Sequence, residues 1–148
     1  MNKNVSEQIK ELVTEAEWLE AFPVVNQLRT NLDESSYIKL VKGAKELHYY
    51  RLFGLYSKNE IAAVIGFMPM TTLYNGKFIW VCDLVTDYPK RSMGYGKKLL
   101  AYIEDWAKDN DIGIVSLSSG LQREDAHRFY ETKMDYKKVS YVFLKNVD

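Results

Sequence analysis

The stretch that decides the fold is Arg91-Ser92-Met93-Gly94-Tyr95-Gly96-Lys97-Lys98. An apolar run at residues 78–85 precedes it and an amphipathic run at residues 99–107 follows it, so the flanks predict a strand, a glycine-bearing turn and a helix. Glycine lets the backbone approach a ligand closely, and the free N–H groups of a helix's first turn point beyond the helix end. The stretch is therefore a candidate anion-binding turn.

The charges around this turn support the same interpretation. Arg91, Lys97 and Lys98 crowd the start of the predicted helix, and positions 90–103 contain no Asp or Glu. A helix N-terminus is the positive end of the helix dipole and normally attracts acidic side chains. Cations are expected there where a phosphate binds. A plain tight turn before a solvated helix would explain the glycines equally well, but not the missing acids.

Three positions of the stretch follow a fixed spacing. Arg91, Gly94 and Gly96 fill the pattern Arg/Gln-x-x-Gly-x-Gly/Ala. This pattern, between its strand and its helix, resembles the acetyl-CoA pyrophosphate loop of the GNAT superfamily of acyl-CoA-dependent N-acyltransferases. A P-loop would need Gly-x-x-x-x-Gly-Lys-Ser/Thr, and a dinucleotide fingerprint would need a third glycine where Leu99 stands, so neither describes this chain.

A second segment, residues 125–131, strengthens the resemblance. Its Ala126, Phe129 and Tyr130 match the family's second cofactor segment, Asn-x-x-Ala-x-x-Phe-Tyr. Two motifs that flank a predicted strand at this separation are far more specific than either motif alone. The resemblance covers nearly the whole chain.

The second segment also departs from the family pattern. Arg123 stands where the family often has Asn, so the usual amide contact to the pantetheine arm or to the acceptor is not expected in its common form. Asp135 replaces the usual glycine before Tyr136, and Asp tolerates a positive φ better than most residues.

Composition narrows the class of protein. The 148 residues are 47% hydrophobic, enough for one packed domain spanning residues 1–148. Lys+Arg and Asp+Glu number 20 each, and this zero net charge disfavours a nucleic-acid partner. The single cysteine, Cys82, fits a reducing compartment, and no apolar run is long enough to span a membrane, so we expect a cytoplasmic protein. His48 and His127 make no ligand-spaced cluster, and no metal is expected.

The periodicity of hydrophobic residues and the positions of turn-forming residues predict the order β-α-α-β-β-β-α-β-α-β. The expected strands are residues 6–13, 50–56, 61–68, 78–86, 112–118 and 139–144, and the expected helices are residues 14–28, with Pro23 ending or kinking the first part, 33–47, 92–109 and 123–133. Short turns, including Asn75-Gly76, make the middle three strands an antiparallel meander. The fold class is α/β (α+β): a mixed, mainly antiparallel sheet with a central βαβ crossover and flanking helices, as in GNAT domains.

The resemblance implies an enzyme that transfers an acetyl group from acetyl-CoA to a primary amine by direct attack in a ternary complex. It places the pyrophosphate against the turn and lets the backbone before the turn pair with the pantetheine arm as an added strand. The implied cofactor-binding residues are Leu84, Val85, Thr86, Arg91, Ser92, Met93, Gly94, Tyr95, Gly96, Lys97, Arg123 and Tyr130, with Lys98 as a further positive charge.

Two side chains are candidates for proton transfer. Tyr130 matches the family's tyrosine, and a phenol can protonate the leaving CoA thiolate; the alternative is that Tyr130 only packs. Asp83, in a run otherwise apolar, is the best candidate for the base, because burial would raise its pKa; the alternatives are local pairing, Glu60, or ordered water. Cys82 is expected to be a buried hydrophobe rather than a nucleophile.

The acceptor is less readable. Aromatic side chains of the first two helices and the nearby turns, among them Trp18, Tyr37, Tyr50 and Tyr74, could line a pocket for a cationic amine. A small-molecule amine is the leading expectation, and a protein or peptide amine remains open. Two other classes also remain: a non-catalytic acyl-CoA-binding or sensing module, and a protein-interaction subunit using a sheet edge. The resemblance adds a possible homodimer formed through the last strands.

Overall fold

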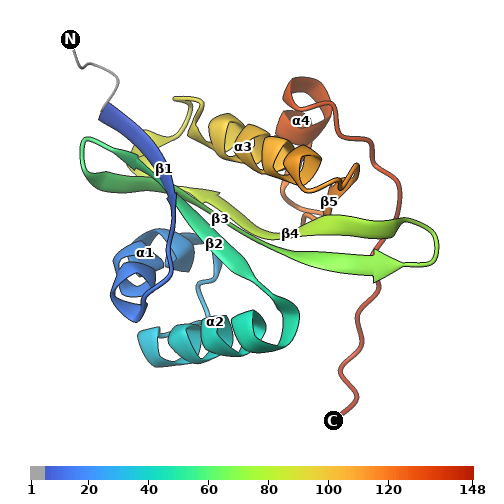
Figure 1. Ribbon diagram of the computed structural model, residues 1–148, viewed down its shortest axis with the longest axis horizontal. Helices are drawn as coiled ribbons and strands as arrows, with labels where there is room; N and C mark the ends of the chain where they lie inside the picture. The colour runs from blue at the N-terminus through green and yellow to red at the C-terminus, as the bar shows by residue number, and fades with distance from the viewer. Residues whose placement is uncertain (1–5) are drawn as a thin grey trace. The chain divides into compact units, whose positions relative to one another are not determined.

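The computed structural model describes residues 6–148, which form two compact units, one ending at Ser116 and one running from Leu117 to Asp148. Figure 1 shows the elements in chain order. The first unit contains β1 (Glu7–Glu11), α1 (Glu15–Leu28), α2 (Glu34–His48), β2 (Arg51–Ser57), β3 (Glu60–Thr72), β4 (Gly76–Thr86), a 3₁₀ turn (Tyr88–Lys90) and α3 (Tyr95–Asp109). The short β5 (Val115–Leu117) lies at the junction of the two units.

The sheet has the strand order β1-β2-β3-β4-β5. Strands β1 to β4 pair antiparallel, which confirms the predicted meander. Strand β5 is the neighbour of β4, and α3 joins them along the chain, as the predicted crossover requires. The register shifts between Gly66 and Phe67, where β4 carries one more residue than β3. This bulge lies directly beside Asp83, the partner of Gly66.

Helices cover both faces of the sheet in the first unit. Figure 1 shows α1 and α2 on one face and α3 on the other. Phe67 contacts Trp106 of α3 with ring centroids 5.1 Å apart, and Phe53 contacts Tyr102 at 5.5 Å. On the opposite face, a cluster of buried side chains includes Trp18 of α1. Each helix thus buries its apolar stripe on the sheet.

The predicted helix starts are confirmed where a side chain caps them. Thr14 caps α1 with the capping box that includes Glu17, and Asp33 accepts a hydrogen bond from the Ser36 N–H at the start of α2. The predicted extent of α1 to Leu28 is also confirmed, and Pro23 lies inside the helix without ending it.

Helix α3 begins later than predicted. We expected it from residue 92, but it starts at Tyr95. Ser92 has φ = 67° and Gly94 has φ = 83°, and neither value is compatible with a right-handed helix. Residues 91–94 therefore form a separate turn in front of the helix.

The second unit is small and partly irregular. It contains α4 (Glu124–Arg128), which continues into a π-helical turn (Phe129–Lys133). Asp135 has φ = 61°, so this Asp occupies the left-handed position that the family gives to glycine. The predicted closing strand at 139–144 is wrong: residues 137–148 have no regular structure, and the apolar side chains there are exposed. A strand needs a partner edge, and this segment pairs with none in the described chain.

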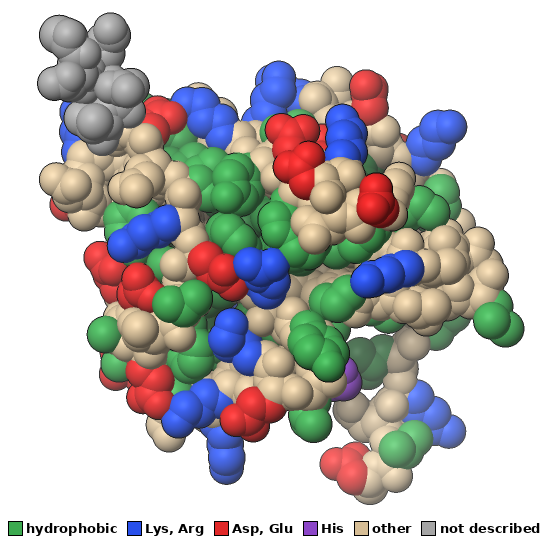
Figure 2. Space-filling view, in the orientation of Figure 1, with side chains coloured by type: hydrophobic (Ala, Val, Ile, Leu, Met, Phe, Trp, Pro, Cys, Tyr) green, Lys and Arg blue, Asp and Glu red, His purple; other side chains and the backbone are tan. Residues whose placement is uncertain are grey.

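The surface is mixed in character. On the face shown in Figure 2, acidic and basic side chains alternate with apolar ones. Among residues 6–148, none of the helices has the length and apolar character required to cross a bilayer. Over the same residues, His, Cys, Asp and Glu do not gather into a group that could hold a metal ion.

Candidate active site

The turn between β4 and α3 is tied to the elements around it. The Asp87 N–H donates to the Ala62 carbonyl of β3 at 2.8 Å. Gln27 of α1 then holds the turn twice, because its amide nitrogen donates to the Asp87 carboxylate at 2.8 Å and its amide oxygen accepts from the Tyr88 N–H at 2.9 Å. The turn is therefore fixed in position by α1 and β3.

The start of α3 has the features of an anion site. Gly94 is its N-cap in the left-handed region, and no side chain of the described residues caps the helix. Helix geometry leaves the first N–H groups, those of Tyr95, Gly96 and Lys97, without an intrahelical acceptor. The first turn contains no acidic residue. These donors and the helix dipole fit the pyrophosphate of a CoA molecule.

Two predicted cofactor residues of the turn, Arg91 and Tyr95, have further contacts. The Arg91 guanidinium lies 5.0 Å from the Tyr88 ring, and its Nε donates to the Thr86 carbonyl at 3.3 Å. The Tyr95 side chain is buried and its hydroxyl donates to Ser57 Oγ at 3.1 Å, so Tyr95 has its backbone N–H left for a ligand. Ser92 and Met93, between Arg91 and Tyr95, are exposed.

The end of β4 leads directly into this turn. Leu84, Val85 and Thr86 pair on one side with β3, opposite Ile65, Val64 and Ala63. On the other side lies β5, which has three residues against eleven in β4. Most of that edge of β4 is therefore not hydrogen-bonded to β5, and an extended ligand such as the pantetheine arm could pair with it.

Asp83 lies in a polar network rather than in the apolar setting expected from its sequence neighbours. Its Oδ1 accepts from Arg29 Nε at 2.9 Å, and its Oδ2 accepts from the Tyr50 hydroxyl at 2.7 Å. Arg29 also donates from Nη2 to the Cys82 carbonyl at 2.8 Å. Burial, and next the charge of Asp83, raise the pKa of Tyr50 far above its ordinary value, so this phenol is a permanent donor at neutral pH. The carboxylate is held at both oxygens.

Gly66 makes this arrangement possible. It lies opposite Asp83 in the β3–β4 register, so both positions face the same side of the sheet. A Cβ atom at Gly66 would lie 1.9 Å from the Tyr50 hydroxyl oxygen. The absent side chain is therefore the space that the end of the Tyr50 ring occupies.

Tyr130 lies in the second unit, where its ring contacts Phe129 and Tyr136 with centroids 5.3 and 6.1 Å apart. It is buried, and burial raises its pKa while the charge of Arg123 opposes the rise. The phenol is thus protonated at neutral pH, as a proton donor must be. Arg123 itself is exposed, at the N-cap of α4.

Cys82 is a poor candidate for a nucleophile. Burial, and next the charge of Asp83, raise the pKa of its thiol to about 12, with Arg29 opposing the rise. The reactive form of cysteine is the thiolate, which is scarce at such a pKa. The structure therefore agrees with a packing role.

Two other predicted charges have different partners. Glu60, an alternative base, lies at the start of β3 with an exposed side chain paired to Lys90 at 3.0 Å. Lys98, expected to add positive charge for the cofactor, pairs instead with Glu7 of β1 at 2.5 Å. Each of these two side chains therefore has an ion-pair partner within the described residues.

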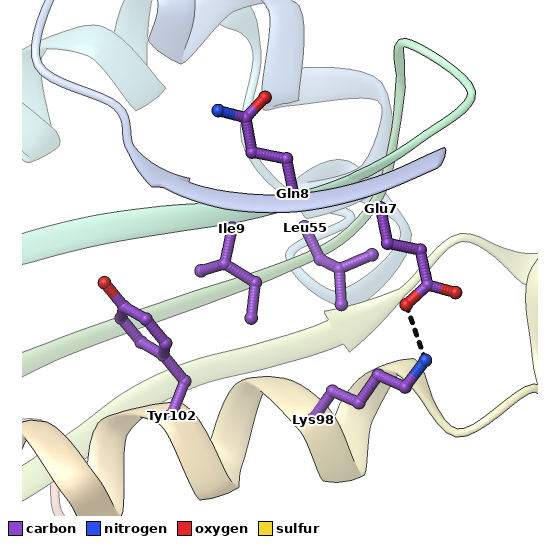
Figure 3. Close-up of a pocket in the computed structure, with 6 residues that line it drawn as sticks. All are labelled: Glu7, Gln8, Ile9, Leu55, Lys98 and Tyr102. Atoms are coloured by element: carbon purple, nitrogen blue, oxygen red, sulfur yellow. Dashed lines mark hydrogen bonds and ion pairs between the residues drawn. The ribbon is translucent and has the colours of Figure 1, made fainter. Parts of the chain in front are cut away.

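A shallow cavity of about 290 Å³ lies next to the Lys98–Glu7 pair. Figure 3 shows Ile9, Leu55 and Tyr102 facing one another there, with Gln8 turned away. Apart from Lys98, its lining contains none of the side chains that the sequence selected. The cavity is therefore separate from the candidate active site.

Comparison with known proteins establishes the family. The model of the acetyltransferase (GNAT) family matches residues 12–136. The uncharacterized N-acetyltransferase YhdJ of Bacillus subtilis (strain 168) is 45% identical over 139 residues, which are 94% of this chain and 98% of that protein. The aminoalkylphosphonate N-acetyltransferase of Salmonella typhimurium is 31% identical over 98 residues, 66% of this chain and 62% of that protein. The chain belongs to the GNAT family.

Solved structures show the same fold. The aminoglycoside N-acetyltransferase AAC(6')-Iy, solved in complex with CoA, superposes with a TM-score of 0.82 at 10% identity, over 95% of this chain and 94% of that one. Family membership makes this protein an N-acyltransferase, and members of the family bind CoA or acetyl-CoA.

Sequence reasoning missed three residues of the site: Arg29, Tyr50 as a partner of Asp83, and Gly66. A glycine inside an apolar strand run often marks a bulge or a close approach, so Gly66 carried a readable signal. Arg29 carried none, because it lies 54 positions from Asp83 and at the end of a helix.

Proposed function

We propose that this protein transfers an acetyl group from acetyl-CoA to the primary amine of a small molecule, by direct attack in a ternary complex. The observation that carries the proposal is the uncapped N-terminus of α3, with Gly94 in the left-handed region and no acid in its first turn, directly after β4. Acetyl-CoA, when bound, supplies the acetyl group as a thioester. The proposal treats residues 1–148 as one acetyltransferase domain, which the family match across both units supports.

The turn and the strand before it would hold the cofactor. In this proposal the N–H groups of residues 93–97 bind the pyrophosphate, Arg91 and Ser92 complete the turn, and the backbone of Leu84, Val85 and Thr86 pairs with the pantetheine arm. Arg123 is assigned to the same cofactor from its place beside the second motif.

Proton transfer would involve two side chains of the chain. The amine nitrogen forms a bond to the acetyl carbon while the carbon–sulfur bond breaks. Asp83, directly or through water, takes the amine proton, and Tyr130 gives its phenol proton to the thiolate sulfur. Two observations support these roles: each Asp83 oxygen accepts one hydrogen bond and so retains a second lone pair, and the pKa of Tyr130 is raised.

The acceptor class is drawn from the relatives. The similar protein of Salmonella typhimurium is named for an aminoalkylphosphonate, and the structural neighbour for an aminoglycoside; both are small-molecule amines. We extend this class to the present chain, with a protein or peptide amine as the alternative. The proposal includes a cytoplasmic location, which the unpaired Cys82 supports, and a homodimer.

The test is release of free thiol from acetyl-CoA over a panel of alkylamines, aminoalkylphosphonates, aminoglycosides and peptide N-termini, with the product identified by mass. Arg91→Ala should weaken acetyl-CoA binding, and Lys108→Ala, an exposed cation in the last turn of α3, is the control. Thiol release with an amine supports the enzyme and names its acceptor. Tight acetyl-CoA binding with no release on any amine would favour the sensing module. No binding at all would exclude the phosphate-loop assignment.

A further inference from the structure

The acceptor side of Asp83 contains an ion pair with unused hydrogen-bonding capacity. A guanidinium has five N–H donors, and the structure uses one from Nε and one from Nη2 of Arg29. Asp83 has one bond at each oxygen, so each oxygen retains a second lone pair. The Arg29 side chain is 42% exposed and the Asp83 side chain is 18% exposed, so a small molecule can reach both.

The position of this pair connects it to the reaction. Asp83 directly precedes Leu84, the first residue assigned to the pantetheine arm, and its side chain faces the α1 and α2 side of the sheet, opposite to α3. Arg29 is the C-cap of α1, and Tyr50 follows the end of α2. The carboxylate and the guanidinium therefore lie together where both helices end, beside the strand that would present the acetyl group.

The same geometry argues against an aromatic-lined pocket that would bind a cationic amine. Tyr37 and Tyr50 are buried, and their hydroxyls are already bonded to the Trp18 carbonyl and to Asp83. Trp18 is also buried. Cation–π recognition needs an accessible ring face, which these three side chains do not offer. Tyr74, the fourth aromatic residue considered, is exposed, but it lies on the turn between β3 and β4.

The opposite charges of Arg29 and Asp83 discriminate between simple alkylamines and amines that also have an anionic group. A simple alkylammonium ion approaching the pair is attracted by Asp83 and repelled by Arg29, so the pair gives it little net attraction. An amine that also has an anionic group matches both partners, with the ammonium on Asp83 and the anion on the free guanidinium N–H groups.

We propose that the Arg29–Asp83 pair is the acceptor-recognition site and that it selects a short primary amine with a carboxylate or phosphonate group a few bonds away. Tyr50, seated over Gly66, positions the Asp83 carboxylate for this contact. The inference rests on the proposed acetyltransferase function, since it names the acceptor of that reaction.

The experiment compares matched acceptors of one length: propylamine, 3-aminopropanamide, 3-aminopropanoate and 3-aminopropylphosphonate. Thiol release gives kcat and KM for each, and calorimetry in the presence of CoA gives acceptor binding without turnover. The wild-type kcat/KM for the two anionic amines should exceed that for propylamine at least about tenfold, a factor that corresponds to roughly 1.4 kcal/mol. A clear difference between carboxylate and phosphonate identifies which anion the site takes.

Arg29→Gln removes the charge and keeps a donor group. It should abolish the preference through a raised acceptor KM while the KM for acetyl-CoA is unchanged. Arg29→Lys keeps the charge but loses the bidentate donor geometry of the guanidinium, so it should keep part of the preference for anionic amines. It is the variant to measure if Arg29→Gln does not fold. Lys39→Gln, an exposed cation of α2, is the matched control and should keep the full preference.

Three results separate the possible failures. Equal wild-type rates with propylamine and the anionic amines would overturn the inference while the acetyltransferase function stands. An anionic preference that survives Arg29→Gln would assign the selection to another residue. Absence of thiol release with every acceptor would contradict the proposed function, and calorimetric binding of 3-aminopropanoate, lost in Arg29→Gln, would still decide the inference.

Discussion

At the scale of single residues, the Tyr130 hydroxyl has the clearest chemical role to test. Tyr130→Phe removes the proposed proton donor and keeps the ring that contacts Phe129 and Tyr136. We expect kcat to fall about 100-fold, the lower range for general acid catalysis, while the KM for acetyl-CoA changes little. Steady-state kinetics at saturating acceptor measures both.

Tyr141→Phe is the matched control, because that phenol is exposed in the C-terminal segment and should not affect kcat. The raised pKa of Tyr130 adds a pH test: the phenol stays protonated as the pH rises through 9, so the wild-type rate should show no loss attributable to this group there. Equal rates of Tyr130→Phe and wild type would remove Tyr130 from the mechanism.

Gly66 should be sensitive to the smallest possible substitution. The methyl group in Gly66→Ala would collide with the Tyr50 hydroxyl, so the ring must move away from Asp83. We expect a loss of about 1–3 kcal/mol in the free energy of unfolding, as for other overpacked sites. We also expect a raised acceptor KM that matches that of Tyr50→Phe. Denaturation curves and kinetics measure the two effects.

The cause of the Gly66→Ala effect can be isolated. In a Tyr50→Phe background the hydroxyl is already absent, so adding Gly66→Ala should change the acceptor KM little further, and a double-mutant cycle measures this coupling. Gly43→Ala is the control, because nothing lies within 4 Å of a Cβ at that helical position. Fully additive effects on the acceptor KM would contradict the positioning role of Gly66.

Cys82 provides a test of chemistry that the enzyme should not use. With its pKa raised to about 12 by burial and by Asp83, the thiol should react slowly with a disulfide reagent at pH 8 in the folded protein and rapidly after unfolding. Cys82→Ala should keep kcat within about twofold, because direct transfer needs no acyl-cysteine. A stable acetylated Cys82, detected by mass, would instead show a two-step mechanism.

At the scale of elements, the turn before α3 depends on α1. Gln27→Ala removes two hydrogen bonds to the turn, at Asp87 and at the Tyr88 N–H. Each such bond contributes about 0.5–1.5 kcal/mol. The loosened turn should raise the KM for acetyl-CoA about three- to tenfold, with kcat nearly unchanged. Gln8→Ala on β1 is the control, and an unchanged acetyl-CoA KM in Gln27→Ala would show that the turn holds its shape without α1.

The sequence was sufficient to predict most elements because their signals are local. The caps at Thr14 and Asp33, the meander and the strand–turn–helix around Gly94 all follow from residues within a few positions of one another. The start of α3 was misplaced because the positive φ of Ser92 carries no sequence signature. Local pattern therefore predicted most of the elements, left their exact ends open and failed for residues 139–144, which are not a strand.

The candidate site was predictable only in part for the same reason. The turn is a local motif, whereas the network at Asp83 joins residues 53, 54 and 33 positions apart through side-chain geometry. The expectation that Asp83 is buried among apolar side chains came from its sequence neighbours, and the fold places Arg29 and Tyr50 against it instead. Contacts between residues far apart in the sequence determine the environment of a side chain such as Asp83. They cannot be predicted from a single sequence.

At the scale of the whole molecule, the C-terminal segment is the feature that a lone chain does not explain. Its large apolar side chains are 70–93% exposed over residues 139–144, although their sequence predicts a strand. Water contact with so many apolar groups is unfavourable, by about 1.5–3 kcal/mol for each side chain that could be buried. A second copy of the chain, which offers its own identical segment and sheet edge, would bury them.

This argument gives the prediction for the proposed homodimer. Light scattering coupled to size exclusion should give the full chain twice its 17.2 kDa mass, and a chain ending at residue 137 should give the monomer mass. Val142→Lys with Leu144→Lys keeps the length, opposes burial by charge and should also dissociate the dimer. Lys137→Glu, at the polar start of the segment, is the charge-changing control. If the truncated chain remains dimeric, the interface lies elsewhere; if the full chain is monomeric, the exposed segment has another partner and the homodimer is excluded.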